Sequence, residues 1–258
     1  MTANACPGHK YVVVLGSCCS ADAIRPKNLE DIHGAKLRLL WYQGRTSPLS
    51  MASAGLTPSE FRYTSERDKV TNPAWELTMV TDELEKRQQR RLVEVIRMSD
   101  ALILDIVSAF GFPYHMVRPD GRCFLRSKDW QRYVVLLTNF DQKRLWEFPM
   151  GLSVAALNKS LVELYQLQPN LRVIFHLPKP CFNDGISFND SQLEENIDFY
   201  FAYGEHLYRE ALRSFPRVSM IGCGGERADP RHYIGPYPFH YDEGYMTAVR
   251  KEIERLLE

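Results

Sequence analysis

Two kinds of potential nucleophile follow the first apolar run of the sequence. The run Tyr11–Gly16 is rich in β-branched residues and closed by glycine, and Ser17, Cys18 and Cys19 come directly after it. A serine or cysteine in such a turn can attack a carbonyl carbon when a base removes its proton. Backbone N–H groups from Ser17 to Cys19 could hold the resulting oxyanion, and a helix N-terminus here would lower the pKa of Cys18. The alternative is that these small residues only let a strand and a helix pack closely.

A pair of histidines lies in a segment rich in proline and aromatic residues, before a final helical pattern. The segment runs from Asp229 to Tyr245 and contains His232 and His240. A rigid loop of this kind can hold an imidazole as a general base, the role that histidine fills most often near neutral pH. The alternative is that the histidines only cap or pack against the start of the helix.

Short apolar runs alternate with helical patterns along the chain. The runs that predict strands are Tyr11–Gly16, Lys36–Tyr42, Ala101–Val107, Leu171–Leu177 and Val218–Gly222. The patterns that predict helices are Thr81–Met98, Ser153–Leu167, Ser191–Phe215 and Asp242–Leu257. This alternation indicates right-handed crossovers between parallel strands. We therefore expect a three-layer α/β/α fold with a flavodoxin-like parallel sheet of about five strands and helices on both faces.

Two stretches depart from this alternation. We interpret Gly44–Pro73 as a long loop with a short helix near Leu49–Ala54, and Ala109–Lys128 as a hairpin inserted after the third strand. Tyr133–Leu137 is a further apolar run. Because long loops in compact domains are often functional, both stretches are candidates to wall a pocket. No repeat or linker divides the chain, so we expect one domain over residues 1–258.

Composition excludes several classes of protein. The 258 residues are 45% hydrophobic and 25% charged, and their formal net charge is zero. No overall positive electrostatic potential therefore favours binding of nucleic acid. The basic run Lys86–Arg91 lies on a helical pattern and fits a solvated face better than a phosphate site. Met1–Lys10 is polar and Tyr11–Gly16 is too short for a signal segment or a membrane span, which predicts a cytoplasmic protein.

The six cysteines show no Cys-x-x-Cys spacing. They therefore signal neither a zinc site nor a disulfide framework, and a Cys18–Cys19 bridge would need strained geometry. The segment Gly16–Ala21 lacks the glycines that let a pyrophosphate approach a helix, which disfavours nucleotide binding. We expect no metal and no cofactor.

The order of the motifs resembles the SGNH/GDSL hydrolase superfamily. More narrowly, the chain resembles an uncharacterised bacterial SGNH-like family with Gly-Ser-Cys in place of Gly-Asp-Ser. The segments that carry the resemblance are Leu15–Asp22, Gly44–Ser50, Asp100–Asp105 and Pro238–Tyr241. The resemblance implies action on an acyl ester, with a glycan or surface-polymer precursor as the acyl carrier.

The resemblance assigns the nucleophile and the base. Gly16 matches the glycine of the superfamily motif, Ser17 its aspartate and Cys18 its nucleophilic serine, while a shift of one residue gives the role to Ser17 instead. His240 matches the histidine because Gly244-Tyr245 follows it. The superfamily has aspartate where this chain has Tyr237, so Asp229 or another carboxylate would orient the imidazole.

The remaining site residues surround these two. The Gly-x-Asn-Asp block of the superfamily is missing, and Asp105 stands near its place, although an aspartate donates to an oxyanion only when protonated. The residues expected to contact substrate are Gly16, Cys19, Arg45, Ser47, Asp105 and His232.

Two functions follow from this reading. The first is an esterase or O-acyltransferase in which Cys18 or Ser17 attacks a small-molecule or glycan acyl substrate and His240 takes the proton. The alternative is a non-catalytic carbohydrate-binding or accessory protein on a degenerate scaffold. Hydrogen-bond reach between His240 and Cys18 or Ser17 favours the enzyme. The oligomeric state is open.

Overall fold

The computed structural model describes most of the chain. The described residues are 8–25, 36–44, 46–68, 75–111, 114–126, 130–181, 196–222, 226–229, 231 and 239–258. Arg45, His232 and the first residues of the predicted helix Ser191–Phe215 lie outside them.

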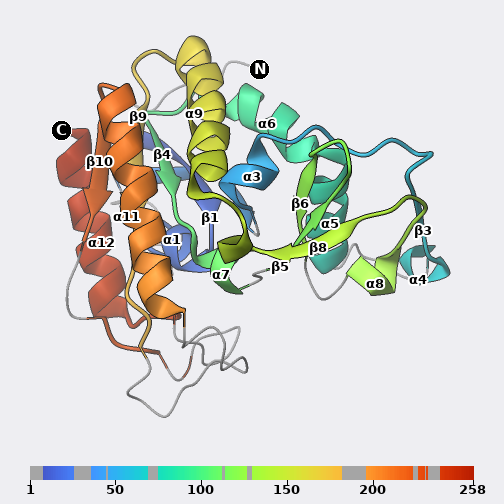
Figure 1. Cartoon of the computed structure of the whole chain (residues 1–258). Helices are drawn as coiled ribbons and strands as arrows, with labels where there is room; N and C mark the ends of the chain where they lie inside the picture. The colour runs from blue at the N-terminus through green and yellow to red at the C-terminus, as the bar shows by residue number, and fades with distance from the viewer. Residues whose placement is uncertain are drawn as a thin grey trace.

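A parallel sheet of five strands forms the centre of the molecule (Figure 1). Its strands are β1 (Lys10–Gly16), β2 (Leu37–Gly44), β4 (Ala101–Leu104), β9 (Arg172–His176) and β10 (Val218–Ile221). The order across the sheet is β10-β9-β4-β1-β2, and every neighbouring pair is parallel. In chain order this is the flavodoxin-like arrangement 2-1-3-4-5. The predicted fold class is confirmed.

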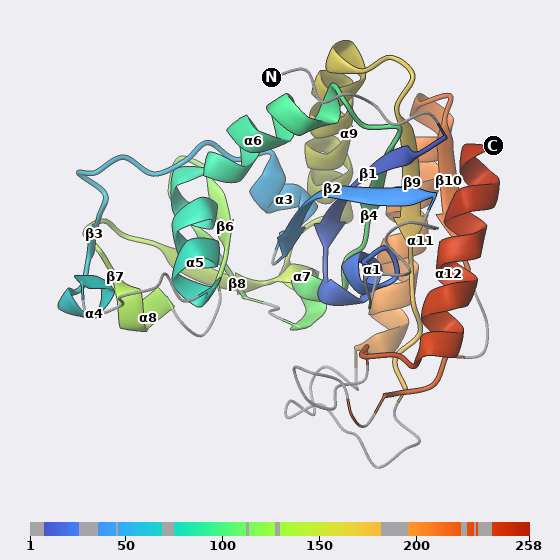
Figure 2. The same ribbon diagram turned by 180° about the vertical axis from the view of Figure 1, so that it is seen from behind.

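Helices cover both faces of this sheet, as Figures 1 and 2 show from opposite sides. On one face lie α9 (Met150–Leu167) and α11 (Ile197–Ser214), and on the other lie the short α1 (Cys18–Asp22) and α12 (Glu243–Leu257). The central strands β1 and β4 are buried on both sides, which explains their unbroken apolar sequence.

A smaller assembly extends beyond the β2 side of the sheet. Its antiparallel sheets are β6-β5-β8 and β3-β7. The strands are β3 (Phe61–Tyr63), β5 (Tyr114–Val117), β6 (Cys123–Leu125), β7 (Val134–Leu136) and β8 (Asp141–Arg144). The helices are α3 (Pro48–Met51), α4 (Ser65–Asp68), α5 (Trp75–Glu85), α6 (Arg87–Ile96), α7 (Val107–Gly111), α8 (Trp130–Tyr133) and the 3-10 turn η1 (Leu145–Glu147). The predicted hairpin is confirmed as β5 and β6, which pair antiparallel.

The single helix predicted over Thr81–Met98 is wrong. The chain breaks at Lys86, whose φ of 51° is left-handed, so that α5 ends before it and α6 begins after it. The Lys86 side chain is only 3% exposed and its ammonium donates to Glu83 and Ser50. The predicted solvated face therefore begins only at Arg87, which is exposed.

The third strand is shorter than predicted. It ends at Leu104 rather than Val107, because the Asp105 carboxylate accepts the backbone N–H of Val107 at 3.1 Å and turns the chain into α7. No helix among the described residues is both long and apolar enough to cross a membrane.

Candidate functional site

The structure brings Cys18 and His240 together from opposite ends of the chain. Cys18 begins α1 directly after β1, and His240 lies just before α12. Their Sγ and Nε2 atoms are 3.4 Å apart, a distance that suits a hydrogen bond to sulfur, although 222 residues separate them. His240 is buried and Cys18 is half-buried. The site lies at the carboxyl end of β1, where ligands bind in open parallel sheets.

A short ladder holds the backbone of His240. The N–H of Asp229 donates to the carbonyl of His240 at 2.7 Å, and the N–H of Asp242 donates to the carbonyl of Arg227 at 2.9 Å. The Asp229 carboxylate accepts the backbone N–H of Arg231 at 2.9 Å. Asp229 thus contacts His240 through the main chain, and its predicted role in orienting the imidazole stays a prediction.

Asp105 holds the turn that precedes Cys18. Its Oδ2 atom accepts the backbone N–H of Ser17 at 2.9 Å and the Ser17 hydroxyl at 3.0 Å. A Cβ atom at Gly16 would lie 2.4 Å from Cγ of Asp105, so only glycine fits there. The Ser17 hydroxyl also lies 2.6 Å from Sγ of Cys19. The turn therefore places Cys18 beside the imidazole and Ser17 beside the carboxylate.

A buried chain of polar side chains continues from Asp105, and we call Asp105, Ser20, His176 and Tyr245 the polar relay. Ser20 Oγ donates to Asp105 Oδ2 at 2.5 Å and lies 2.8 Å from His176 Nδ1. His176 Nε2 lies 2.9 Å from the Tyr245 hydroxyl. Burial lowers the pKa of His176 to about 4, so the imidazole is neutral, and burial raises the pKa of Asp105.

Sequence reasoning missed three of these residues. Ser20 carried no signal of its own, and Tyr245 served only to place His240 in the superfamily motif. His176, however, is the last residue of β9, and the carboxyl ends of parallel strands are where ligands bind in open sheets.

The Cys18 thiol is not activated by its helix. Burial raises its pKa to about 12, and the nearby carboxylates of Asp22 and Asp105 act in the same direction. The prediction that the helix N-terminus lowers this pKa is wrong, because burial and the two carboxylates outweigh the lowering by the backbone of the short α1 and by Arg25, which pairs with Asp22 at 3.2 Å. Cys18 and Cys19 carry reduced thiols rather than a vicinal disulfide.

The remaining predicted residues have structural contacts. Ser47 is the N-cap of α3, where its hydroxyl oxygen accepts the N–H of Ser50 at 3.2 Å, and it also lies 2.8 Å from His115 Nε2. Cys19 is 1% exposed. No set of His, Cys, Asp or Glu side chains within the described ranges is grouped so as to hold a metal ion.

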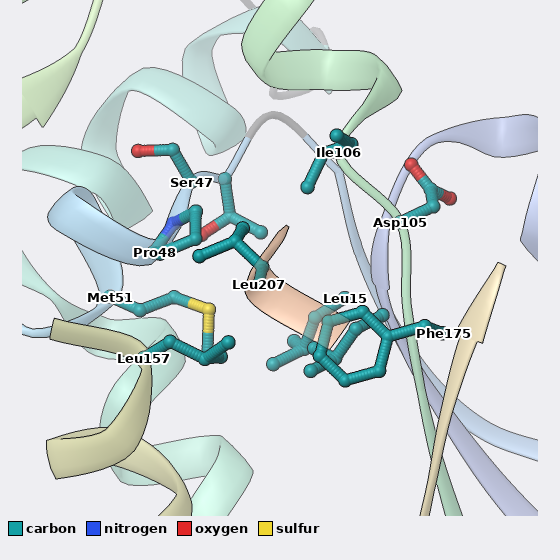
Figure 3. Close-up of a pocket in the computed structure, with 11 residues that line it drawn as sticks. Leu15, Ser47, Pro48, Met51, Asp105, Ile106, Leu157, Phe175 and Leu207 are labelled. Carbon is teal, nitrogen blue, oxygen red and sulfur yellow. The ribbon is translucent and has the colours of Figure 1, made fainter. Parts of the chain in front are cut away.

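Two cavities lie near the site without containing it. One of about 20 Å³, room for about one water, is walled by apolar side chains together with Ser47 and Asp105, as Figure 3 shows. A larger one of about 250 Å³ lies between β2, α6 and α9, and Trp41, Gln88 and Leu164 line it. Neither Cys18 nor His240 lines either cavity.

Comparison with known proteins gives distant likenesses only. No model of a known family matches the sequence, and no curated protein matches it. An active-site mutant of a family two carbohydrate esterase from Clostridium thermocellum aligns with 97% of this chain at 11% identity and a TM-score of 0.41. An acetyl xylan esterase from Butyrivibrio proteoclasticus aligns with 96% of this chain at 12% identity and a TM-score of 0.39. A Bacteroides fragilis protein provisionally named an acylhydrolase aligns with 96% of this chain at 9% identity and a TM-score of 0.45.

The lengths of these proteins differ from that of this chain. The alignment covers 63% of each of the two esterases and 86% of the Bacteroides fragilis protein. Similarity at this level assigns neither an activity nor a substrate to the chain.

Proposed function

We propose that this protein is an acyl-ester hydrolase or acyltransferase in which Cys18 is the nucleophile and His240 is the base. The observation that carries the proposal is the 3.4 Å contact between Cys18 Sγ and His240 Nε2. Ser17, the other candidate nucleophile, donates its hydroxyl to Asp105 at 3.0 Å. That bond favours Cys18, because the single proton of the Ser17 hydroxyl is already donated to a buried carboxylate.

The chemistry follows from the resting protonation states. With its pKa raised to about 12, Cys18 is a neutral thiol at neutral pH, so its proton must leave as the sulfur attacks. Sγ bonds to the carbonyl carbon while His240 Nε2 takes the thiol proton. The tetrahedral intermediate collapses when Nε2 returns that proton to the departing alkoxide, leaving a thioester on Cys18. Water, or an alcohol acceptor, then attacks the thioester carbon and gives its proton to His240 Nε2. The C–S bond breaks as Nε2 passes that proton to Sγ, which restores the Cys18 thiol and releases the acid or the new ester.

Backbone groups at the start of α1 supply the oxyanion site in this proposal. The N–H of Ser17 donates to Asp105, and the Ser17 side chain caps no N–H of the helix. The N–H groups of Cys18 and Cys19 are therefore the ones we assign to the oxyanion.

An acylated glycan or surface-polymer precursor is the substrate class that the superfamily resemblance implies. Acetylated oligosaccharides and short-chain nitrophenyl esters test that class directly. The competing function is a carbohydrate-binding or accessory protein that keeps the scaffold without the reaction.

Active-site labelling tests the proposal. Purified protein is treated with iodoacetamide or with a fluorophosphonate, and adducts are located by mass spectrometry. We expect iodoacetamide to modify Cys18 in the wild type at least tenfold faster than in His240→Ala, because the base is lost. Buried Cys19 is the internal control and should stay unmodified. A fluorophosphonate adduct on Ser17 would reverse the assignment of the nucleophile, and equal Cys18 rates in both proteins would favour the binding function.

A further inference from the structure

The polar relay connects the helix of the nucleophile to the helix of the base. Ser20 lies on α1, the helix that Cys18 begins, and Tyr245 lies in the first turn of α12, directly after His240. His176, at the end of β9, bridges the two with contacts of 2.8 Å to Ser20 and 2.9 Å to Tyr245. The reaction proposed above does not use Ser20, His176 or Tyr245, and none of the three lines either cavity.

With Asp105 ionised, the protons of the relay are arranged in one way. The Asp105 carboxylate accepts from Ser20, so the single hydroxyl proton of Ser20 is used there. The Ser20 oxygen must then accept the proton on His176 Nδ1. A neutral imidazole with Nδ1 protonated has a bare Nε2, which accepts from the Tyr245 hydroxyl. Ser20 and His176 each accept one hydrogen bond and donate another, so the relay has a defined direction from Tyr245 to Asp105.

The relay is also buried throughout. Ser20 and His176 are each 1% exposed and Tyr245 is 2% exposed. Removing one member leaves a neighbouring polar group without a partner and without access to water, which is costly. The backbone of Tyr245 is tied in turn to the segment of His240, since its N–H donates to the Asp242 side chain at 3.0 Å.

We propose that Asp105, Ser20, His176 and Tyr245 are positioning residues that set the separation of Cys18 from His240. This inference rests on the function proposed above. Cys18 and His240 are far apart in the sequence and lie on different elements, so their distance depends on how α1 and the start of α12 are held together. The relay is a direct hydrogen-bonded link between those two elements, and an ångström of displacement at a reacting pair can cost roughly a hundredfold in rate.

The sharpest test is Tyr245→Phe, which deletes the last hydroxyl of the relay. The ring remains, so its contact with Tyr241, with centroids 4.3 Å apart, is kept. The control is Tyr200→Phe, which deletes another fully buried hydroxyl, bonded to the carbonyl of Pro178 at 3.1 Å, outside the relay. We expect Tyr245→Phe to slow iodoacetamide labelling of Cys18 roughly tenfold and Tyr200→Phe to leave it within twofold.

A second measurement separates positioning from loss of folding. The ¹⁵N resonances of His176 in the wild type should show a protonated Nδ1, and that signature should weaken in Tyr245→Phe.

A double variant tests whether the relay acts as one unit. Ser20→Ala breaks the relay at its other end. Because both changes disable one unit, the double variant should label Cys18 little more slowly than the slower single variant.

The outcomes separate the two proposals. If His240→Ala labels as fast as the wild type, the proposed function fails and the positioning role fails with it. If labelling depends on His240 but Tyr245→Phe behaves like Tyr200→Phe, the function stands and the relay is overturned. If the double variant slows labelling of Cys18 by the product of the two single factors, Tyr245 and Ser20 act independently and the relay is overturned as well.

Discussion

A thiol with a raised pKa needs a base at the moment of attack. In Cys18 the neutral thiol is favoured by burial and by the carboxylates of Asp22 and Asp105. A preformed thiolate is therefore disfavoured, and in the proposed reaction His240 accepts the proton while the new bond forms. At the residue scale, the proposed mechanism is that of a serine hydrolase with sulfur in place of the hydroxyl oxygen.

The pH dependence of alkylation tests this description. In His240→Ala we expect the iodoacetamide rate at Cys18 to rise about tenfold per pH unit from pH 7 to 10 without levelling off. The reason is that the thiolate fraction keeps rising below a pKa of about 12. Intact-mass kinetics across that range measure it, and a plateau near pH 8.5 would show an ordinary thiol instead.

At the scale of elements, the break between α5 and α6 lies at a polar junction that holds parts of the smaller assembly together. Glu83, near the end of α5, accepts from the Lys86 ammonium at 3.0 Å and from the N–H of Leu125 in β6 at 2.7 Å, and it also accepts from Ser50 in α3. One buried carboxylate thus joins two helices and a strand. The left-handed turn at Lys86 is what points the ammonium inward.

Lys86→Met tests this junction. Methionine has nearly the same length and the same Cβ, so the backbone strain is unchanged while the cation is lost. We expect a loss of about 3–5 kcal/mol in the free energy of unfolding, because the Glu83 carboxylate is left buried without its counterion. Urea denaturation measures the loss. Arg87→Met, a change at an exposed ion pair one residue later, should cost no more than about 1 kcal/mol.

At the scale of the whole molecule, the neutral His176 inside the fold makes stability depend on pH. Its pKa is about 4 in the folded protein and returns to the ordinary value of 6.5 on unfolding. Between those values the unfolded chain binds more protons than the folded one, so stability falls as pH drops from about 6.5 to 4.

Comparison of the wild type with His176→Gln isolates that contribution. Between about pH 6.5 and 4, the free energy of unfolding of the wild type should fall by about 3 kcal/mol more than that of the variant. The figure follows from a pKa difference of about 2.5 at 1.36 kcal/mol per pH unit. Urea unfolding at closely spaced pH values provides the comparison. Parallel curves for the two proteins would mean that the pKa of His176 is the same in the folded and unfolded states.

The sequence by itself determined the fold class. Short apolar runs rich in β-branched residues are typical of strands buried on both faces, and helical patterns between them indicate crossovers, so the parallel sheet followed from local patterns. The same rules placed Cys18 at the end of the first strand and His240 before the last helix. They did not show the break at Lys86, because its cause is a carboxylate and a hydroxyl brought in by tertiary packing.

Only the tertiary structure supplies the contacts on which the proposed chemistry of the site rests. The choice between Ser17 and Cys18 depends on the direction in which each side chain points, and Asp105 sets that direction from the far side of the turn. The pKa of Cys18 depends on burial and on carboxylates that the sequence motif does not contain. Periodicity is a property of neighbouring residues, whereas hydrogen bonds and desolvation arise between elements that meet only when the sheet is assembled.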